Sequence, residues 1–146
     1  MKSERSPITA RWMLVDDDEQ LRPTIAKLIA ALAGVEVVEF SSGAAALAAL
    51  TAAPDTFTFV VSDLDSPHMS GIEFCRRLKL FRPQLQVLLA TGSGLITEPE
   101  ALAQGFCGLI HKPFSVAALR RVIAAAGLPE VHQPVQAGVA PVCLAA

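Results

Sequence analysis

The sequence contains no tyrosine, one tryptophan and three cysteines, which are too few and too scattered for a disulfide framework. Cys75, Cys107 and Cys143 are odd in number, and their spacing matches no metal-ligand motif. Reduced thiols explain this usage best, so we expect a reducing compartment, the cytoplasm.

Long apolar runs and clusters of positive charge are also missing. No uninterrupted apolar stretch reaches the roughly 18 residues of a membrane span, and residues 1–11 lack the apolar stretch of a signal peptide. The formal net charge is −2, and basic residues adjoin only in short pairs such as Arg76-Arg77 and Arg120-Arg121. Such pairs are typical of solvated helix faces, so we expect neither a nucleic acid nor a membrane as partner.

Hydrophobic residues are abundant, at 52% of the chain against 18% charged residues. This balance favours one folded domain of ordinary size over disorder. We expect that domain over residues 9–127, after an N-terminal extension of residues 1–8. Residues 128–146 include Pro129, Pro134 and Pro141 and show no periodicity, so we expect an irregular or disordered tail.

Short apolar runs alternate with longer stretches of helical periodicity. The runs predict buried strands over residues 12–15, 35–40, 57–62, 87–90 and 108–110. Strands that alternate with helices predict the α/β class, with one five-stranded parallel sheet and helices on both of its faces. Helical spacing also places Phe81 and Val116 on the inward faces of their helices.

Several residues are placed to begin or end these helices. Asp18, Ser42 and Ser115 are candidate N-caps, and Thr97 and Glu100 have the spacing of a capping box. Gly34 and Gly127 are suited to end the first and last helices.

Polar residues fall where the predicted strands end. Asp16 and Asp17 follow the first strand, Asp63 and Asp65 follow the third, and Thr91 and Lys112 follow the fourth and fifth. Because ligands of open α/β sheets bind beyond the carboxyl ends of the strands, we expect these side chains to converge.

Converging carboxylates repel one another unless a cation lies between them. Carboxylate oxygens together with waters suit Mg²⁺. A lysine and a hydroxyl beside such a metal form a phosphoryl-binding set, and a carboxylate held there can act as the nucleophile. The pattern therefore predicts a phosphoryl group accepted on Asp63.

Each residue alone has a simpler interpretation. Asp18 is placed to be a helix cap, Asp63 alone would more often form an Asx-turn, and Lys112 alone would be an exposed lysine. Turn chemistry does not explain why acidic, hydroxyl and lysine side chains follow successive strands in this order, so we prefer the joint interpretation.

Four segments resemble the receiver domain of two-component response regulators, and the similarity covers residues 11–127. The segments are 14–18 (LVDDD), 60–71 (VVSDLDSPHMSG), 88–92 (LLATG) and 108–114 (GLIHKPF). The resemblance implies a doubly wound, flavodoxin-like (CheY-like) fold. It also implies that Asp63 is the phosphoacceptor, while Thr91 and Lys112 contact the phosphoryl oxygens.

The resemblance further implies the metal site and the partners. Asp16, Asp17, Asp63 and the backbone carbonyl of Asp65 would hold Mg²⁺, and the Lys112–Pro113 peptide would be cis. A sensor histidine kinase or phosphotransfer protein would donate the phosphoryl group. An unknown downstream protein would bind the region 99–121, and a homodimer through the last two helices is possible in the family. Such a domain is a signalling switch that catalyses only its own phosphorylation and dephosphorylation.

The sequence departs from the family pattern at four positions. Leu109 stands where the family often has an aromatic residue, which excludes an aromatic switch at this position. Ser66 replaces a usually apolar residue before Pro67, Asp65 adds a carboxylate beside the acceptor, and Gly92 follows Thr91. We expect the phosphoryl lifetime to depend on Asp65 and the acceptor to be open beside Gly92.

Two alternatives remain open from the sequence. Asp63-Leu64-Asp65 superficially matches the nucleophile motif of haloacid-dehalogenase-type phosphatases, although the residues after it and the position of the acidic pair do not fit that class. A receiver-like binding module that is not phosphorylated is the other alternative, since the part of the chain after residue 127 is too short for an output domain.

Overall fold

A computed structural model describes residues 10–65 and 68–125 of the chain. Strands and helices alternate throughout the described residues. The strands are β1 (Arg11–Val15), β2 (Glu36–Phe40), β3 (Phe57–Asp63), β4 (Gln86–Thr91) and β5 (Gly108–His111). The helices are α1 (Leu21–Ala33), α2 (Gly43–Ala52), α3 (Gly71–Phe81), α4 (Glu98–Ala103) and α5 (Val116–Ala125).

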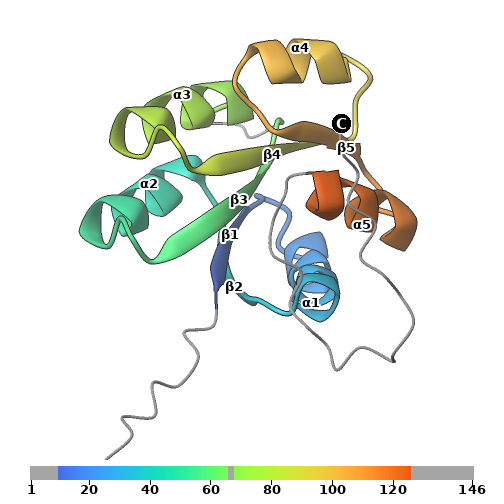
Figure 1. Cartoon of the computed structure of the whole chain (residues 1–146), viewed down its shortest axis with the longest axis horizontal. Helices are drawn as coiled ribbons and strands as arrows, with labels where there is room; N and C mark the ends of the chain where they lie inside the picture. The colour runs from blue at the N-terminus through green and yellow to red at the C-terminus, as the bar shows by residue number, and fades with distance from the viewer. Residues whose placement is uncertain (1–9, 66–67, 126–146) are drawn as a thin grey trace, which may run out of the picture.

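The strands form one parallel sheet in the order β2-β1-β3-β4-β5. Helices α2 and α3 cover one face of the sheet together with α4, and α1 and α5 cover the other (Figure 1). The predicted five-stranded parallel sheet with helices on both faces is confirmed.

Side chains of successive strand residues enter opposite faces of the sheet and build two cores. On β1, Met13 and Val15 belong to the core beneath α2 and α3, whereas Trp12 and Leu14 belong to the core beneath α1 and α5. Because the sheet is covered on both sides, its strands consist of almost continuous apolar residues.

Short polar residues begin four helices; the caps at Ser42, Ser115 and Thr97 were predicted, and the one at Ser70 was not. The Ser42, Ser70 and Ser115 hydroxyls accept backbone N–H groups at the starts of α2, α3 and α5, and Thr97 and Glu100 form a capping box on α4. Gly34 ends α1 with a φ of 63°, a left-handed conformation that glycine adopts without strain. The Asp18 carboxylate accepts the N–H groups of Gln20 and Leu21, so it caps the turn that leads into α1.

Two predicted inward positions are wrong. Phe81 is 52% exposed and Val116 is 46% exposed. Each is a terminal residue of its helix, where helical spacing does not reveal whether a neighbouring element still covers the side chain. Gly127, the predicted end of the last helix, lies outside the described residues, as does Ser66.

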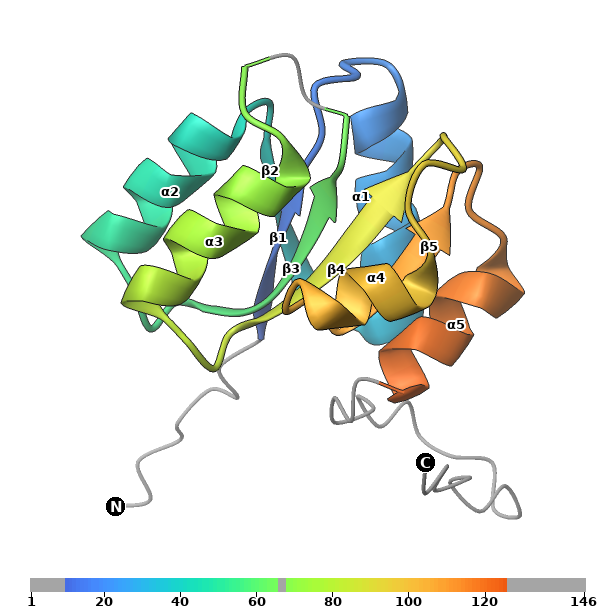
Figure 2. The ribbon, with the colours of Figure 1, turned by 90° about the horizontal axis from the view of Figure 1, so that it is seen from above.

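All five strands point the same way, so their carboxyl ends share one edge of the sheet (Figure 2). We call this the acidic edge, after the three aspartates that lie there: Asp16, Asp17 and Asp63. Among the described residues, no helix has the length and hydropathy needed to cross a membrane.

Candidate functional site

Three carboxylates meet at the acidic edge because β1 and β3 are neighbours in the sheet. Each of Asp16, Asp17 and Asp63 offers an oxygen, and these oxygens lie within 4.8 Å of one another. Asp16 and Asp63 are buried, with 2% and 7% of their surface exposed, whereas Asp17 is exposed. The group therefore has an interior part and one side open to solvent.

Asp63 is the last residue of β3 and is held by contacts on both sides. Its Oδ1 accepts the backbone N–H of Asp65 at 3.2 Å. Gly71, which begins α3, approaches so closely that a Cβ there would lie 2.6 Å from the Asp63 carbonyl oxygen. Burial raises the pKa of Asp63, and the Asp65 N–H and the charge of Lys112 only partly oppose this effect.

Asp16 is the most buried carboxylate of the site, and both of its carboxylate oxygens and its backbone carbonyl accept hydrogen bonds. Its Oδ1 accepts the N–H of Asp18 at 2.8 Å, and its Oδ2 accepts Lys112 Nζ at 2.7 Å. The Nη1 of Arg22 donates to the Asp16 backbone carbonyl at 2.9 Å. Arg22 also forms ion pairs with Glu19 and with Glu39 of β2, at 3.8 and 3.4 Å. Arg22 thus ties the start of α1 to the site.

Lys112 follows β5 and bridges two of the carboxylates. Its Nζ lies 2.7 Å from Asp16 Oδ2 and 3.3 Å from Asp63 Oδ2. Burial alone would lower the pKa of Lys112, but the hydrogen bond to Asp16 and the two negative charges together raise it. The backbone N–H of Lys112 donates to the Thr91 carbonyl, and the Lys112–Pro113 peptide is cis, as predicted.

Thr91 ends β4 beside Asp63 and is completely buried. Its hydroxyl faces Ser93: it donates to the Ser93 carbonyl at 3.0 Å, and it accepts the Ser93 N–H at 3.1 Å. In the described ranges, 10–65 and 68–125, this hydroxyl makes no hydrogen bond to Asp16 or Asp63. The edge therefore brings Asp16, Asp17, Asp63 and Lys112 together, while the Thr91 hydroxyl is engaged elsewhere.

Sequence reasoning missed roles for two residues at this edge. No role was predicted for Ser93 or for Arg22. A serine two residues after a threonine is a signal for a local hydroxyl turn. For Arg22, no sequence signal indicates that its guanidinium would donate to the Asp16 backbone carbonyl.

The donor set fits a hard divalent cation. Its ligand atoms are carboxylate oxygens, and Asp17 leaves one side open, which suits an ion that keeps several waters. Lys112 supplies one positive charge against the three carboxylates, so a second cation would be electrostatically favoured. Asp16, Asp17 and Asp63 would hold Mg²⁺ there.

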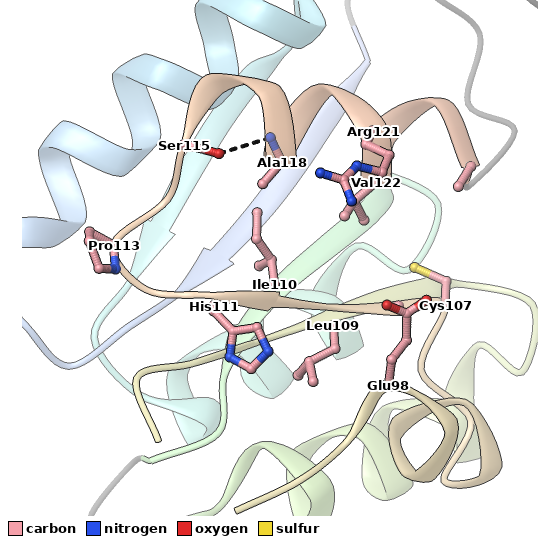
Figure 3. A pocket seen from close by; sticks show the side chains of 12 residues that line it. Glu98, Cys107, Leu109, Ile110, His111, Pro113, Ser115, Ala118, Arg121 and Val122 are labelled. Atoms are coloured by element: carbon pink, nitrogen blue, oxygen red, sulfur yellow. Dashed lines mark hydrogen bonds between the residues drawn. The ribbon is translucent and has the colours of Figure 1, made fainter. Parts of the chain in front are cut away.

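A cavity of about 410 Å³ lies along β5 and α5, apart from the acidic carboxylates. Figure 3 shows Leu109, Ile110 and His111 of β5 on one side and Ala118, Arg121 and Val122 of α5 on another, with Glu98 of α4 also in the lining. Leu109 occupies the position at which an aromatic switch was excluded, and it is buried. Both apolar side chains, such as Leu109 and Val122, and charged ones, such as Glu98 and Arg121, thus line the cavity.

Known proteins share both the sequence pattern and the fold. A family model for the response regulator receiver domain matches residues 13–124. The chain is 31% identical to the response regulator receiver protein CpdR of Brucella abortus, over 71% of this chain and 85% of that protein. It is 35% identical to the response regulator protein FleR of Pseudomonas aeruginosa, over 80% of this chain and 24% of that protein.

A solved structure has the same architecture. The response regulator receiver domain protein of Clostridium thermocellum superimposes with a TM-score of 0.72 and 27% identity, over 80% of this chain and 93% of that one. The chain spans about a quarter of the length of FleR and of the C4-dicarboxylate transport regulator DctD of Rhizobium meliloti. From its sequence, its sheet order and these likenesses, the chain belongs to the response regulator receiver domain family of two-component systems.

Proposed function

We propose that the protein is a phosphorelay switch that accepts a phosphoryl group on Asp63 with the help of Mg²⁺. The observation that carries this proposal is the geometry around Asp63. A buried carboxylate ends β3, with the oxygens of Asp16 and Asp17 within 4.8 Å and Lys112 Nζ at 3.3 Å. The donor would be a phosphohistidine of a sensor histidine kinase or of a phosphotransfer protein.

Asp63, Asp65 and Lys112 have different roles in the proposed phosphoryl transfer. An Asp63 carboxylate oxygen forms the bond to phosphorus while the bond from phosphorus to the donor's imidazole nitrogen breaks, and the imidazole leaves with that electron pair. Asp65 N–H orients the carboxylate through Oδ1, which leaves Oδ2 toward Lys112. Lys112 then compensates charge on the phosphoryl oxygens.

Bound Mg²⁺ would supply further neutralisation of the phosphoryl oxygens. Asp16 and Asp17 are the residues that would hold it beside Asp63, with the carbonyl of Asp65. Asp16 is fixed for this role by the Asp18 N–H, and its backbone carbonyl is fixed by Arg22. Asp17, which is exposed, would bind the ion from the side that is open to solvent.

The downstream partner would bind over residues 99–121, where the cavity of about 410 Å³ lies between β5 and α5. The strand that lines this cavity, β5, is the neighbour of β4, which ends at Thr91. Leu109 of β5 lies in the cavity wall, and Lys112 follows the end of the same strand. A shift of β5 that follows phosphorylation would therefore reach the cavity. The same face would serve if the protein forms a homodimer.

The test is phosphorylation with a small donor. The wild-type protein is incubated with Mg²⁺ and acetyl phosphate, and its intact mass is measured. We expect one added phosphoryl group, none in Asp63→Asn, and wild-type labelling in Asp55→Asn, whose side chain is fully exposed. Absence of label in folded wild type, or equal label in Asp63→Asn, would refute the proposal.

The same experiment decides between the alternatives. A receiver-like binding module without phosphorylation would stay unlabelled. A haloacid-dehalogenase-type phosphatase would turn over a phosphate monoester, but membership of the receiver family leaves that alternative without support.

The lifetime of the phosphoryl group on Asp63 is a further test, because we propose that the Asp65 carboxylate affects its hydrolysis by water. An unchanged dephosphorylation rate in Asp65→Asn would contradict this role.

A further inference from the structure

One residue satisfies the whole hydrogen-bonding capacity of the Thr91 hydroxyl. A hydroxyl donates one hydrogen bond and accepts two. Thr91 Oγ1 donates to the Ser93 carbonyl at 3.0 Å, accepts the Ser93 N–H at 3.1 Å and lies 3.1 Å from Ser93 Oγ. With the proton of the third contact on Ser93 Oγ, all three positions are filled. The hydroxyl has no capacity left for another partner.

Thr91 is nevertheless placed at the proposed phosphorylation site. Asp63 pairs with Ala90 in the sheet, and the N–H of Leu64 donates to the Ala90 carbonyl at 2.8 Å. Thr91 therefore lies on the strand next to Asp63, one residue closer to the carboxyl end of that strand than the partner of Asp63. It is completely buried. For its hydroxyl to donate to a phosphoryl oxygen on Asp63, its proton must leave the Ser93 carbonyl.

We propose that Ser93 is a positioning residue that holds the Thr91 hydroxyl away from Asp63 until a phosphoryl group competes for it. The inference rests on the proposed function of Asp63. Ser93 acts only through Thr91, and its side chain adds one hydrogen bond to the two that its backbone makes. The strength of this hold sets how readily the site recognises a phosphoryl group.

The loop around Ser93 has room for the exchange. A Cβ added at Gly92 or at Gly94 would meet no atom within 4 Å, and both glycines are exposed. The Ser93 carbonyl and hydroxyl can therefore turn to solvent once Thr91 leaves them. A charged phosphoryl oxygen is a stronger acceptor than a neutral carbonyl, so it wins the competition for the proton.

The first arm of the test needs no phosphoryl group. Three-bond couplings to the Thr91 methyl group report its χ1 rotamer by NMR in the full chain. We expect one rotamer in wild type and a measurably larger minor-rotamer population in Ser93→Ala, which keeps only the two backbone contacts. Ser41→Ala, an exposed loop serine after β2, should leave the rotamer unchanged. Averaging already in wild type, or a fixed rotamer in Ser93→Ala, would overturn the inference. This arm holds even if Asp63 is never phosphorylated.

The second arm measures binding of beryllofluoride, a phosphoryl mimic, with Mg²⁺ by NMR titration. Because one neutral hydrogen bond is removed, Ser93→Ala should bind roughly two- to tenfold more tightly than wild type. The increase should vanish when Thr91→Val is also present, since Ser93 then has no hydroxyl to hold. A purely structural serine would instead weaken binding when replaced.

Each outcome of the second arm has one meaning. Equal or weaker binding by Ser93→Ala, or an equal gain in the Thr91→Val background, contradicts the role of Ser93. If folded wild type binds no beryllofluoride, the proposed function of Asp63 fails, and the rotamer measurement alone then decides whether Ser93 holds the Thr91 hydroxyl.

Discussion

In the described part of the chain, Lys112 is the only positively charged side chain within 4 Å of the site carboxylates. It contacts two of them, Asp16 and Asp63. Its side chain is 15% exposed and that of Asp16 is 2% exposed, so the pair is largely removed from water. The balance of charge at the site thus depends on a single ammonium group, and a cation bound by the same oxygens would share its role.

Replacing Lys112 by Gln should therefore make stability dependent on Mg²⁺. Without Mg²⁺ the unpaired Asp16 and Asp63 should lower the free energy of unfolding by about 2 kcal/mol, somewhat less than for a fully buried pair. Added Mg²⁺ should restore most of this loss. Urea unfolding with and without Mg²⁺ measures both values, and Lys27→Gln, an exposed lysine of α1, is the control. A loss no greater than that of the control would contradict the prediction.

Cys107 offers a second measurement on a single residue. Burial raises the pKa of its thiol from 9.0 to about 11. Since only the thiolate reacts, its fraction at pH 8 falls about a hundredfold, and alkylation should keep accelerating up to about pH 11 instead of levelling near 9. Iodoacetamide labelling followed by peptide mass analysis checks this. The urea-unfolded protein is the control, and levelling near pH 9 in the folded protein would count against it.

At the scale of elements, β3 and α3 approach each other closely at Gly71. A Cβ at Gly71 would lie 2.6 Å from the Asp63 carbonyl oxygen and 3.1 Å from Leu64 Cα. Both neighbours are backbone atoms, so neither can move aside by a change of rotamer. The start of α3 is therefore in direct contact with the backbone of Asp63.

Gly71→Ala should lower the free energy of unfolding by about 1 to 3 kcal/mol, because the added methyl overpacks the junction. It should also slow phosphorylation, since Asp63 must shift. Gly94→Ala is the matched control: its Cβ meets nothing within 4 Å, and its effect should stay within about 0.5 kcal/mol. Urea unfolding and the rate of mass increase with acetyl phosphate are the two measurements, and similar values for both variants would argue against the close contact.

Helix ends were easier to predict from the sequence than the exposure of individual side chains. Ser42, Thr97 and Gly34 mark helix ends through local hydrogen bonds, which the sequence encodes within a few residues, and these predictions are confirmed. The predicted inward positions of Phe81 and Val116 were wrong, because the exposure of a side chain depends on elements that are distant in the sequence. The hold of Ser93 on Thr91 was not foreseen, because a sequence pattern does not say which partner a hydroxyl chooses.

For the whole molecule, the strand order decides which strand ends become neighbours. The order β2-β1-β3-β4-β5 puts β3 between β1 and β4, so Asp63 lies between the acidic pair and Thr91. The residue types and strand ends were readable from the sequence. The convergence of these side chains was also predicted, whereas their separation, within 4.8 Å, comes from the observed pairing of β1 with β3.

Mg²⁺ should stabilise the whole fold if it binds at this edge. At a concentration 100 times its dissociation constant, a ligand of the folded state alone adds about 2.7 kcal/mol. Because Asp17 is exposed, Asp17→Asn should change stability without Mg²⁺ by no more than about 0.5 kcal/mol, yet lose much of the increment. Thermal unfolding with Mg²⁺ and with matched NaCl tests this, and Asp55→Asn should keep the full increment. Equal increments in Asp17→Asn and Asp55→Asn would show that Asp17 is no ligand.

The parallel sheet also determines on which side of the molecule the first strand begins and the last helix ends. β1 starts at Arg11 and α5 finishes at Ala125, and both points lie on the side of the molecule away from the acidic edge (Figure 2). A linker or dye attached at either point would lie away from Asp63. The protein is thus suited to immobilised assays in which the acidic edge faces the solution.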